Sequence, residues 1–75
     1  MQQLVSQLIF DMSRDRFLLD GVDVVPGDLL RVLIFDGLTG AERWQDTRME
    51  MDGSGSYYLF GLLGYQIGGL FACRI

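Results

Sequence analysis

Hydrophobic and polar positions alternate most regularly between residues 44 and 51. Thr47, Met49 and Met51 fall on one side of this segment. The other side carries Trp44, Asp46, Arg48 and Glu50. Because successive side chains of a strand point to opposite faces of a sheet, the alternation predicts a half-buried strand with the Thr-Met-Met side inward. A glycine-serine segment follows at residues 52–56, so the pattern predicts a β-hairpin.

Turn signals recur about every ten residues elsewhere in the chain, which is typical of all-β sandwiches and barrels. The intervening segments predict strands at residues 5–10, 16–19, 22–25, 29–35, 43–51, 57–62 and 70–75. We expect residues 22–25 to be only a short extended piece, followed by a type II turn at Pro26 and Gly27. Helix is expected at most as one turn within residues 63–68. For residues 1–8 the sequence does not decide between a strand and a short helix.

These short antiparallel strands predict an all-β fold, a small SH3-like barrel of about five to six strands forming one domain over residues 1–75. A closed barrel is favoured because closure removes the unpaired strand edges on which chains aggregate. The similarity to SH3-like barrels rests on the Gly-Asp turn that precedes the apolar strand 29–35 and on Trp44 in the next strand. The acidic-aromatic loops with which such domains hold proline-rich peptides are not recognisable, so peptide binding does not follow.

The chain of 75 residues is 49% hydrophobic, which is more apolar side chain than one small core readily hides. Segment 29–35 shows where the surplus lies, because only Arg31 is polar in it. Its outward side would expose Leu29, Leu33 and Phe35, and this predicts an interface. The N-terminal segment, a second copy of the chain or another protein are the three candidates for covering it.

Charge and missing residue types exclude several function classes. The net charge is −4, so nonspecific binding to nucleic acid is not expected. The chain has neither His nor Lys, which removes the usual general base, the commonest metal ligand and Schiff-base chemistry. Cys73 is the only cysteine, and we expect a buried strand residue in a reducing, cytoplasmic compartment. We therefore expect no enzymatic activity, no cofactor and no metal site.

Two other patterns have a structural explanation that we favour. Aspartates are frequent before residue 29, and Asp52 begins a segment like a calcium loop, but its twelfth position is Leu63 instead of a glutamate. We expect these aspartates to build turns. The uncharged run 53–73 is long enough for a membrane helix, yet its six glycines favour two strands joined by a glycine-rich loop, so no membrane span is expected.

The best binding-site candidate is the polar and aromatic side of the 44–51 strand. Its residues are Trp44, Asp46, Arg48 and Glu50. Trp and Arg are enriched at binding hot spots, and an arginine can stack on the tryptophan. Tyr57 and Tyr58 fall on opposite sides of the next strand, so one of them must point outward near this site. In the alternative, Trp44 covers the barrel mouth as a core residue and the charges form weak surface pairs.

A second resemblance covers nearly the whole chain. The residues that carry it are Asp15, Arg16, Phe17, Gly27, Asp28, Val32, Leu33, Trp44, Thr47, Arg48, Met49, Glu50, Tyr58, Leu59, Gly61, Leu62, Gly69, Leu70 and Arg74. In these positions the chain resembles an uncharacterised domain-of-unknown-function family of small proteins from Gram-positive bacteria and their mobile elements. The resemblance implies a compact β-rich protein in a bacterial, plasmid or phage context, and it implies no activity. Residues 39–43 depart from the family pattern as a longer insert.

These observations together favour binding over catalysis. We expect a non-catalytic protein-interaction module, an accessory protein of a mobile element or phage that binds a host protein. The alternative is a homo-oligomer, for instance a homodimer, that sequesters a nucleotide-like small molecule with Arg and Tyr side chains at the subunit interface. An enzyme that works through Asp, Tyr or Arg alone is the third hypothesis.

Overall fold

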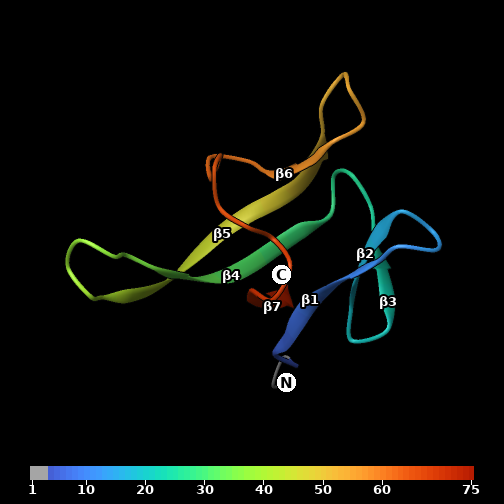
Figure 1. Ribbon diagram of the computed structural model, residues 1–75. Coiled ribbons are helices and arrows are strands. Elements are labelled where there is room, and N and C mark those ends of the chain that lie inside the picture. Colours follow the sequence, from blue (N-terminus) through green and yellow to red (C-terminus); the bar gives the residue numbers. More distant parts are fainter. Residues whose placement is uncertain (1–3) are drawn as a thin grey trace.

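In a computed structural model, residues 4–75 are described, and they form seven strands joined by turns, without a helix (Figure 1). The strands are β1 (Ser6–Asp11), β2 (Arg16–Leu19), β3 (Val22–Val24), β4 (Leu29–Phe35), β5 (Glu42–Met51), β6 (Tyr57–Leu59) and β7 (Phe71–Arg74). The all-β prediction is confirmed. The strand number is seven instead of five to six because β3 pairs with β2 as a true strand.

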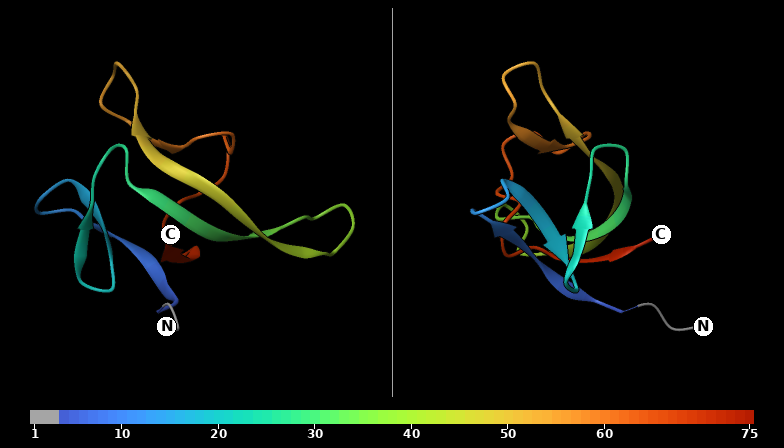
Figure 2. Two further views of the ribbon diagram at one scale, coloured as in Figure 1. Left: turned by 180° about the vertical axis from the view of Figure 1, so that it is seen from behind. Right: turned by 90° about the vertical axis from the view of Figure 1, so that its right-hand side faces the viewer.

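The strands form a single antiparallel sheet in the order β3-β2-β1-β7-β4-β5-β6. The sheet curls into a half barrel (Figure 2). Its two edge strands, β3 and β6, do not pair with each other, so the barrel is not closed. Side chains bridge the open side instead. The Tyr57 hydroxyl donates a hydrogen bond to the carbonyl oxygen of Asp15 at 3.1 Å, and its ring meets the Phe17 ring edge to face at 5.6 Å.

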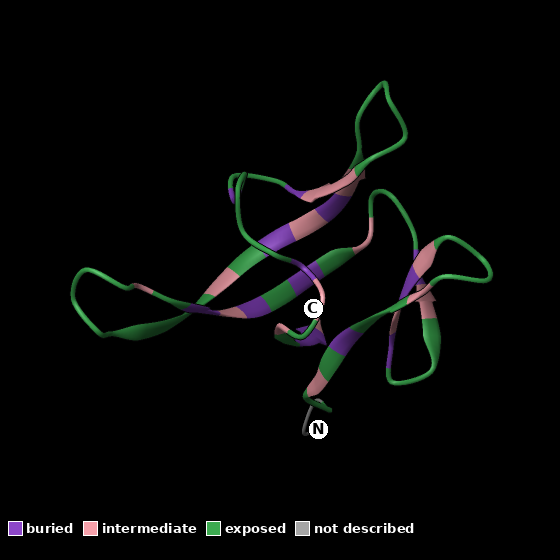
Figure 3. Cartoon of the chain, in the orientation of Figure 1, coloured by how far each residue is buried: buried purple, intermediate pink, exposed green. Residues whose placement is uncertain are grey.

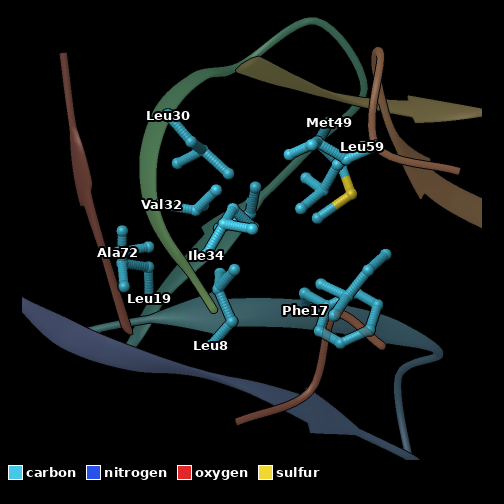
Figure 4. Close-up of a cluster of buried hydrophobic side chains, with 12 residues drawn as sticks. Leu8, Phe17, Leu19, Leu30, Val32, Ile34, Met49, Leu59 and Ala72 are labelled. Atoms are coloured by element: carbon cyan, nitrogen blue, oxygen red, sulfur yellow. The ribbon is translucent and has the colours of Figure 1, made fainter. Parts of the chain in front are cut away.

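The core fills the inside of the curl (Figure 4). Its fully buried large side chains are Leu8, Val24, Leu30, Val32, Ile34, Met49 and Leu59. Thr47 points inward with Met49, as the alternation predicts, and its hydroxyl donates to the carbonyl oxygen of Phe60 at 2.7 Å. Met51, also predicted inward, is 39% exposed because it ends β5, next to the hairpin tip. Cys73 is buried, as predicted.

Most of the aspartates lie in or beside turns, as predicted, whereas Asp23 lies within β3 and pairs with Arg14 and Arg16. The Asp52 carboxylate accepts hydrogen bonds from the backbone N–H groups of Ser54 and Ser56 at 2.9 and 3.0 Å and thereby orders the β5–β6 loop. After β3, the Asp28 N–H donates to the carbonyl oxygen of Val25, and Gly27 has a φ of +97°. A positive φ at the third position is what a type II turn requires, so that turn is confirmed.

The uncharged run 53–73 contains β6, turns and most of β7, and residues 63–68 form turns without a helical turn. No helix long and apolar enough to cross a membrane occurs among the described residues. Strand β6 is shorter than the expected 57–62 strand and ends at Leu59, because the chain turns at Phe60 and Gly61, where φ is +77°.

The β4–β5 hairpin extends beyond the core. Strand β7 pairs only with residues 30–32 of β4, and β6 pairs only with residues 49–51 of β5. The end of this hairpin, residues 35–43, therefore protrudes as an arm without a strand neighbour (Figures 1 and 2). The radius of gyration is 12.2 Å, compared with about 11.3 Å for a compact domain of this length.

Candidate functional site

The register of β4 and β5 brings two separately predicted sets of residues onto one surface. Leu33 lies opposite Trp44, Arg31 opposite Asp46, and Leu29 opposite Arg48. We call this surface the outer face, and it consists of Leu29, Arg31, Leu33, Phe35, Glu42, Trp44, Asp46, Arg48 and Glu50. The predicted interface residues of one strand and the predicted binding residues of the next are therefore cross-strand neighbours on the outer face.

Three of the four apolar residues of the outer face are exposed, and Leu33 is half-buried. In Figure 3, exposed and buried positions alternate along β4. Leu29 is 56% exposed, Phe35 58% and Trp44 47%. Trp44 therefore does not cover the barrel mouth as a core residue. Phe71 of β7 is also exposed. It lies two residues from Cys73, which pairs with Arg31 of the outer face, so Phe71 is on the same side of the sheet. The apolar surface thus continues from β5 across β4 to β7.

The charges at the centre of the outer face neutralise each other. Two nitrogens of the Arg31 guanidinium donate to the two carboxylate oxygens of Asp46, at 2.6 and 3.3 Å. This bidentate contact lowers the pKa of Asp46 and raises that of Arg31. A partner that covers this pair meets no net charge there, which reduces the cost of removing the surface from water.

Arg48 does not contact Trp44. Four residues along a strand correspond to about 13 Å, and the Arg48 guanidinium instead lies 4.0 Å from the ring centre of Phe60. Its Nε donates to Glu50 at 3.1 Å. The prediction that Arg48 stacks on Trp44 is therefore wrong. Phe60 is not among the site residues predicted from the sequence. The alternation could have identified it, because Phe60 lies two residues after the outward Tyr58 in the predicted 57–62 strand and therefore shares its face.

The two tyrosines separate as predicted. Tyr58 lies opposite Glu50 in the β5–β6 ladder and therefore extends the end of the outer face. Tyr57 turns towards the core and contacts Phe17. Tyr58 is consequently the outward tyrosine of the predicted binding set, and Tyr57 belongs to a different part of the molecule.

The N-terminal segment covers the outer face only in part. Val5 lines a shallow hollow of about 250 Å³ together with Arg31, Trp44 and Cys73. Leu29 and Phe35 remain exposed by more than half in the presence of residues 4–8. Residues 1–3 lie outside the described residues. Residues 4–8 therefore do not cover these two side chains, and a second copy or another protein is a candidate for doing so.

Two acidic side chains away from the outer face stabilise local structure at neutral pH. Hydrogen bonds from Arg14 and Arg16 lower the pKa of Asp23, and the Ser54 hydroxyl together with backbone N–H groups lowers that of Asp52. Both carboxylates are therefore ionised and act as hydrogen-bond acceptors. No cluster of three potential metal ligands occurs among the residues that the structure describes. The outer face offers apolar contact, stacking and paired charges, which are means of recognition.

A comparison with protein-family models matches residues 6–70 to DUF5348, which is described as a domain of unknown function. This chain belongs to the DUF5348 family. The match includes strands β1 to β6 and therefore the whole outer face of β4 and β5. Comparisons of this DUF5348 protein with curated proteins and with solved structures give no match. The predicted membership in a domain-of-unknown-function family is confirmed, whereas the SH3-like similarity stays a prediction.

Proposed function

We propose that this DUF5348 protein is a non-catalytic interaction module whose outer face binds a partner protein. The observation that carries the proposal is the apolar surface formed by the exposed Leu29, Phe35 and Trp44 and the half-buried Leu33 around the Arg31–Asp46 pair. Apolar patches of this kind, rimmed by polar residues, mark protein interaction sites. A tryptophan and arginines on the same face add the residue types that dominate binding energy at such sites.

The charges favour a protein over a nucleic acid as the partner. The outer face carries Arg31 and Arg48, and each is already engaged with a carboxylate, of Asp46 and Glu50 respectively. The chain as a whole has a net charge of −4. Attraction to a phosphate backbone requires unpaired cations, which this face does not offer. The open edges of the β4–β5 arm additionally suit a partner that adds a strand to the sheet.

The resemblance to proteins of bacterial mobile elements supports a narrower form of the proposal. In this form the chain is an accessory protein of a mobile element or phage, and its partner is a host protein in the cytoplasm. The single cysteine is compatible with a reducing compartment. The identity of the neighbouring genes tests this narrower form, because a housekeeping operon would contradict it.

A homo-oligomer is the second candidate, and the exposure of Leu29 and Phe35 in a single chain favours it. A second copy would bury the same surface that a partner protein would. A nucleotide-like ligand at that interface has less support, because Arg31 and Arg48 are already paired. Light scattering after size exclusion decides between the two candidates, since a strict monomer at all concentrations removes the oligomer.

Affinity capture with the full chain tests the proposal. The wild type and a Phe35→Ala, Trp44→Ala double variant are used as bait in a lysate of the source cells. Met12→Ala is the matched control, because Met12 is 86% exposed but lies in the β1–β2 turn. We expect a protein that the wild type and the control retain and that the double variant loses. Equal retention by all three baits, with unchanged thermal unfolding, would contradict the assignment of the outer face.

A further inference from the structure

A second recess lies apart from the outer face, where the half barrel stays open. It has a volume of about 450 Å³ and lies between the β1–β2 hairpin, the β5–β6 loop and the turn region at residues 65–68. We call it the aromatic cleft. The lining residues that matter for its chemistry are Phe10, Asp15, Phe17, Tyr57, Tyr65 and Gln66.

Four aromatic residues line this cleft, namely Phe10, Phe17, Tyr57 and Tyr65. Phe10 and Phe17 pack edge to face with their ring centres 4.9 Å apart, and Phe17 contacts Tyr57 in the same way. Tyr65 enters from the loop that precedes β7 and is 41% exposed. The faces of aromatic rings carry negative electrostatic potential, so a cluster of rings attracts a cation.

The charge in the cleft has the same sign as the ring faces. Among the described residues that line the cleft, Asp15 is the only acidic one and no arginine occurs. The neighbouring Arg14 and Arg16 both bind Asp23 instead. Within the described part of the chain, the Asp15 carboxylate makes neither an ion pair nor a hydrogen bond, although its backbone oxygen accepts one from Tyr57. The cleft therefore presents an unneutralised carboxylate beside aromatic rings.

We infer that the aromatic cleft binds a cationic side chain, an arginine or a lysine, presented by a peptide segment of a partner protein. A guanidinium or ammonium group stacks on the rings and forms a charge-assisted hydrogen bond with Asp15. An anionic ligand would face this carboxylate in a chain whose net charge is −4. The cleft and the outer face are separate surfaces, so this binding does not depend on the function proposed for the outer face.

Titration of the full chain with small cations, followed by amide chemical shifts, tests the inference. The probes are N-acetyl-arginine amide and N-acetyl-lysine amide, and the neutral, nearly isosteric N-acetyl-citrulline amide is the control. We expect saturable shifts at Asp15, Tyr57, Tyr65 and Gly68 with at least one cation. The citrulline probe should bind about threefold to tenfold more weakly, since it lacks the charge.

Asp15→Asn is the decisive variant. Asp15 has a φ of +53°, and asparagine tolerates this left-handed conformation as well as aspartate does, so the variant should fold. We expect its affinity for the cation to fall about threefold to tenfold. Leu38→Ala, at a 99% exposed position in the β4–β5 turn, should bind as the wild type does. Three results would overturn the inference: no saturable shift at the cleft with either cation, equal binding of arginine and citrulline probes, or unchanged affinity in Asp15→Asn.

Discussion

Both sides of strand β4 are largely apolar, with Arg31 as the exception on the outward side, but their surroundings are opposite. Leu30, Val32 and Ile34 point into the curl and are 0% exposed. Leu29 and Phe35 alternate with them and are more than half exposed. The hydrophobic effect explains the inward side, because burial there stabilises the fold. It does not explain the outward side, whose apolar residues contribute little to the stability of a single chain and are therefore available to a partner.

The largest expected contrast is between neighbouring residues on the two sides. Ile34→Ala removes buried methyl groups and should lower the free energy of unfolding by about 2–4 kcal/mol, because it leaves a cavity. Phe35→Ala should change it by less than about 0.5 kcal/mol. Urea unfolding of both variants measures the difference. Equal losses would show that the outer face is part of the folding core.

The same contrast on β5 is expected to be smaller. Thr47 points inward and donates a hydrogen bond to Phe60 at 2.7 Å. Thr47→Val keeps the shape and removes this bond, so the free energy of unfolding should fall by about 1 kcal/mol. Asp46→Asn, its outward neighbour, should cost less in the same urea experiment. A Thr47→Val variant as stable as the wild type would argue against this inward hydrogen bond.

Trp44, the only tryptophan, reports directly on the state of the outer face. Because its side chain is about half exposed, its fluorescence in the folded monomer should be quenched readily by acrylamide and should resemble that of a solvated tryptophan. Trp44→Phe should leave the midpoint of urea unfolding nearly unchanged. Emission typical of a buried indole would contradict the exposed position, unless dilution restores quenching, which would instead identify a second copy as the cover.

The smallest effect concerns the charge pair at the centre of the outer face. Arg31 lowers the pKa of Asp46 below its ordinary value of about 3.9. The pair therefore stabilises the fold at pH values above this ordinary pKa, and its contribution is lost as the pH falls through the lower pKa of the folded state. A carboxyl titration by NMR should show the Asp46 midpoint rising in Arg31→Gln. An unchanged midpoint would mean that the pair does not persist in solution.

Alternation in the sequence is sufficient to predict strand β5 and the faces of most of its side chains. Thr47 and Met49 are inward and Arg48 is outward, as expected, because strand side chains have a period of two residues. Closure of the sheet was not predictable in the same way. The pattern assigns a face to each side chain, but how far a sheet curls depends on which edge strands meet, and here Tyr57 and Phe17 meet in place of strand pairing.

Contacts that depend on the register between paired strands could not be predicted from the sequence either. Arg48 stacks on Phe60 because β6 ends at Leu59 and the chain then turns beside β5. The sequence alone does not decide the exposure of Trp44, since a single aromatic residue near the end of a strand can either cover the core or serve as a surface contact. The β4–β5 register decides it by placing Trp44 opposite Leu33 on the outer face.

Site-specific photo-crosslinking in the source cells tests the central claim most directly. A photoreactive phenylalanine analogue replaces Phe35 in one version of the chain and Met12 in another, since both side chains are exposed but only Phe35 lies on the outer face. We predict a discrete crosslinked protein from position 35 and none from position 12. No crosslink at position 35, or the same products from both positions, would contradict a docking role for the outer face.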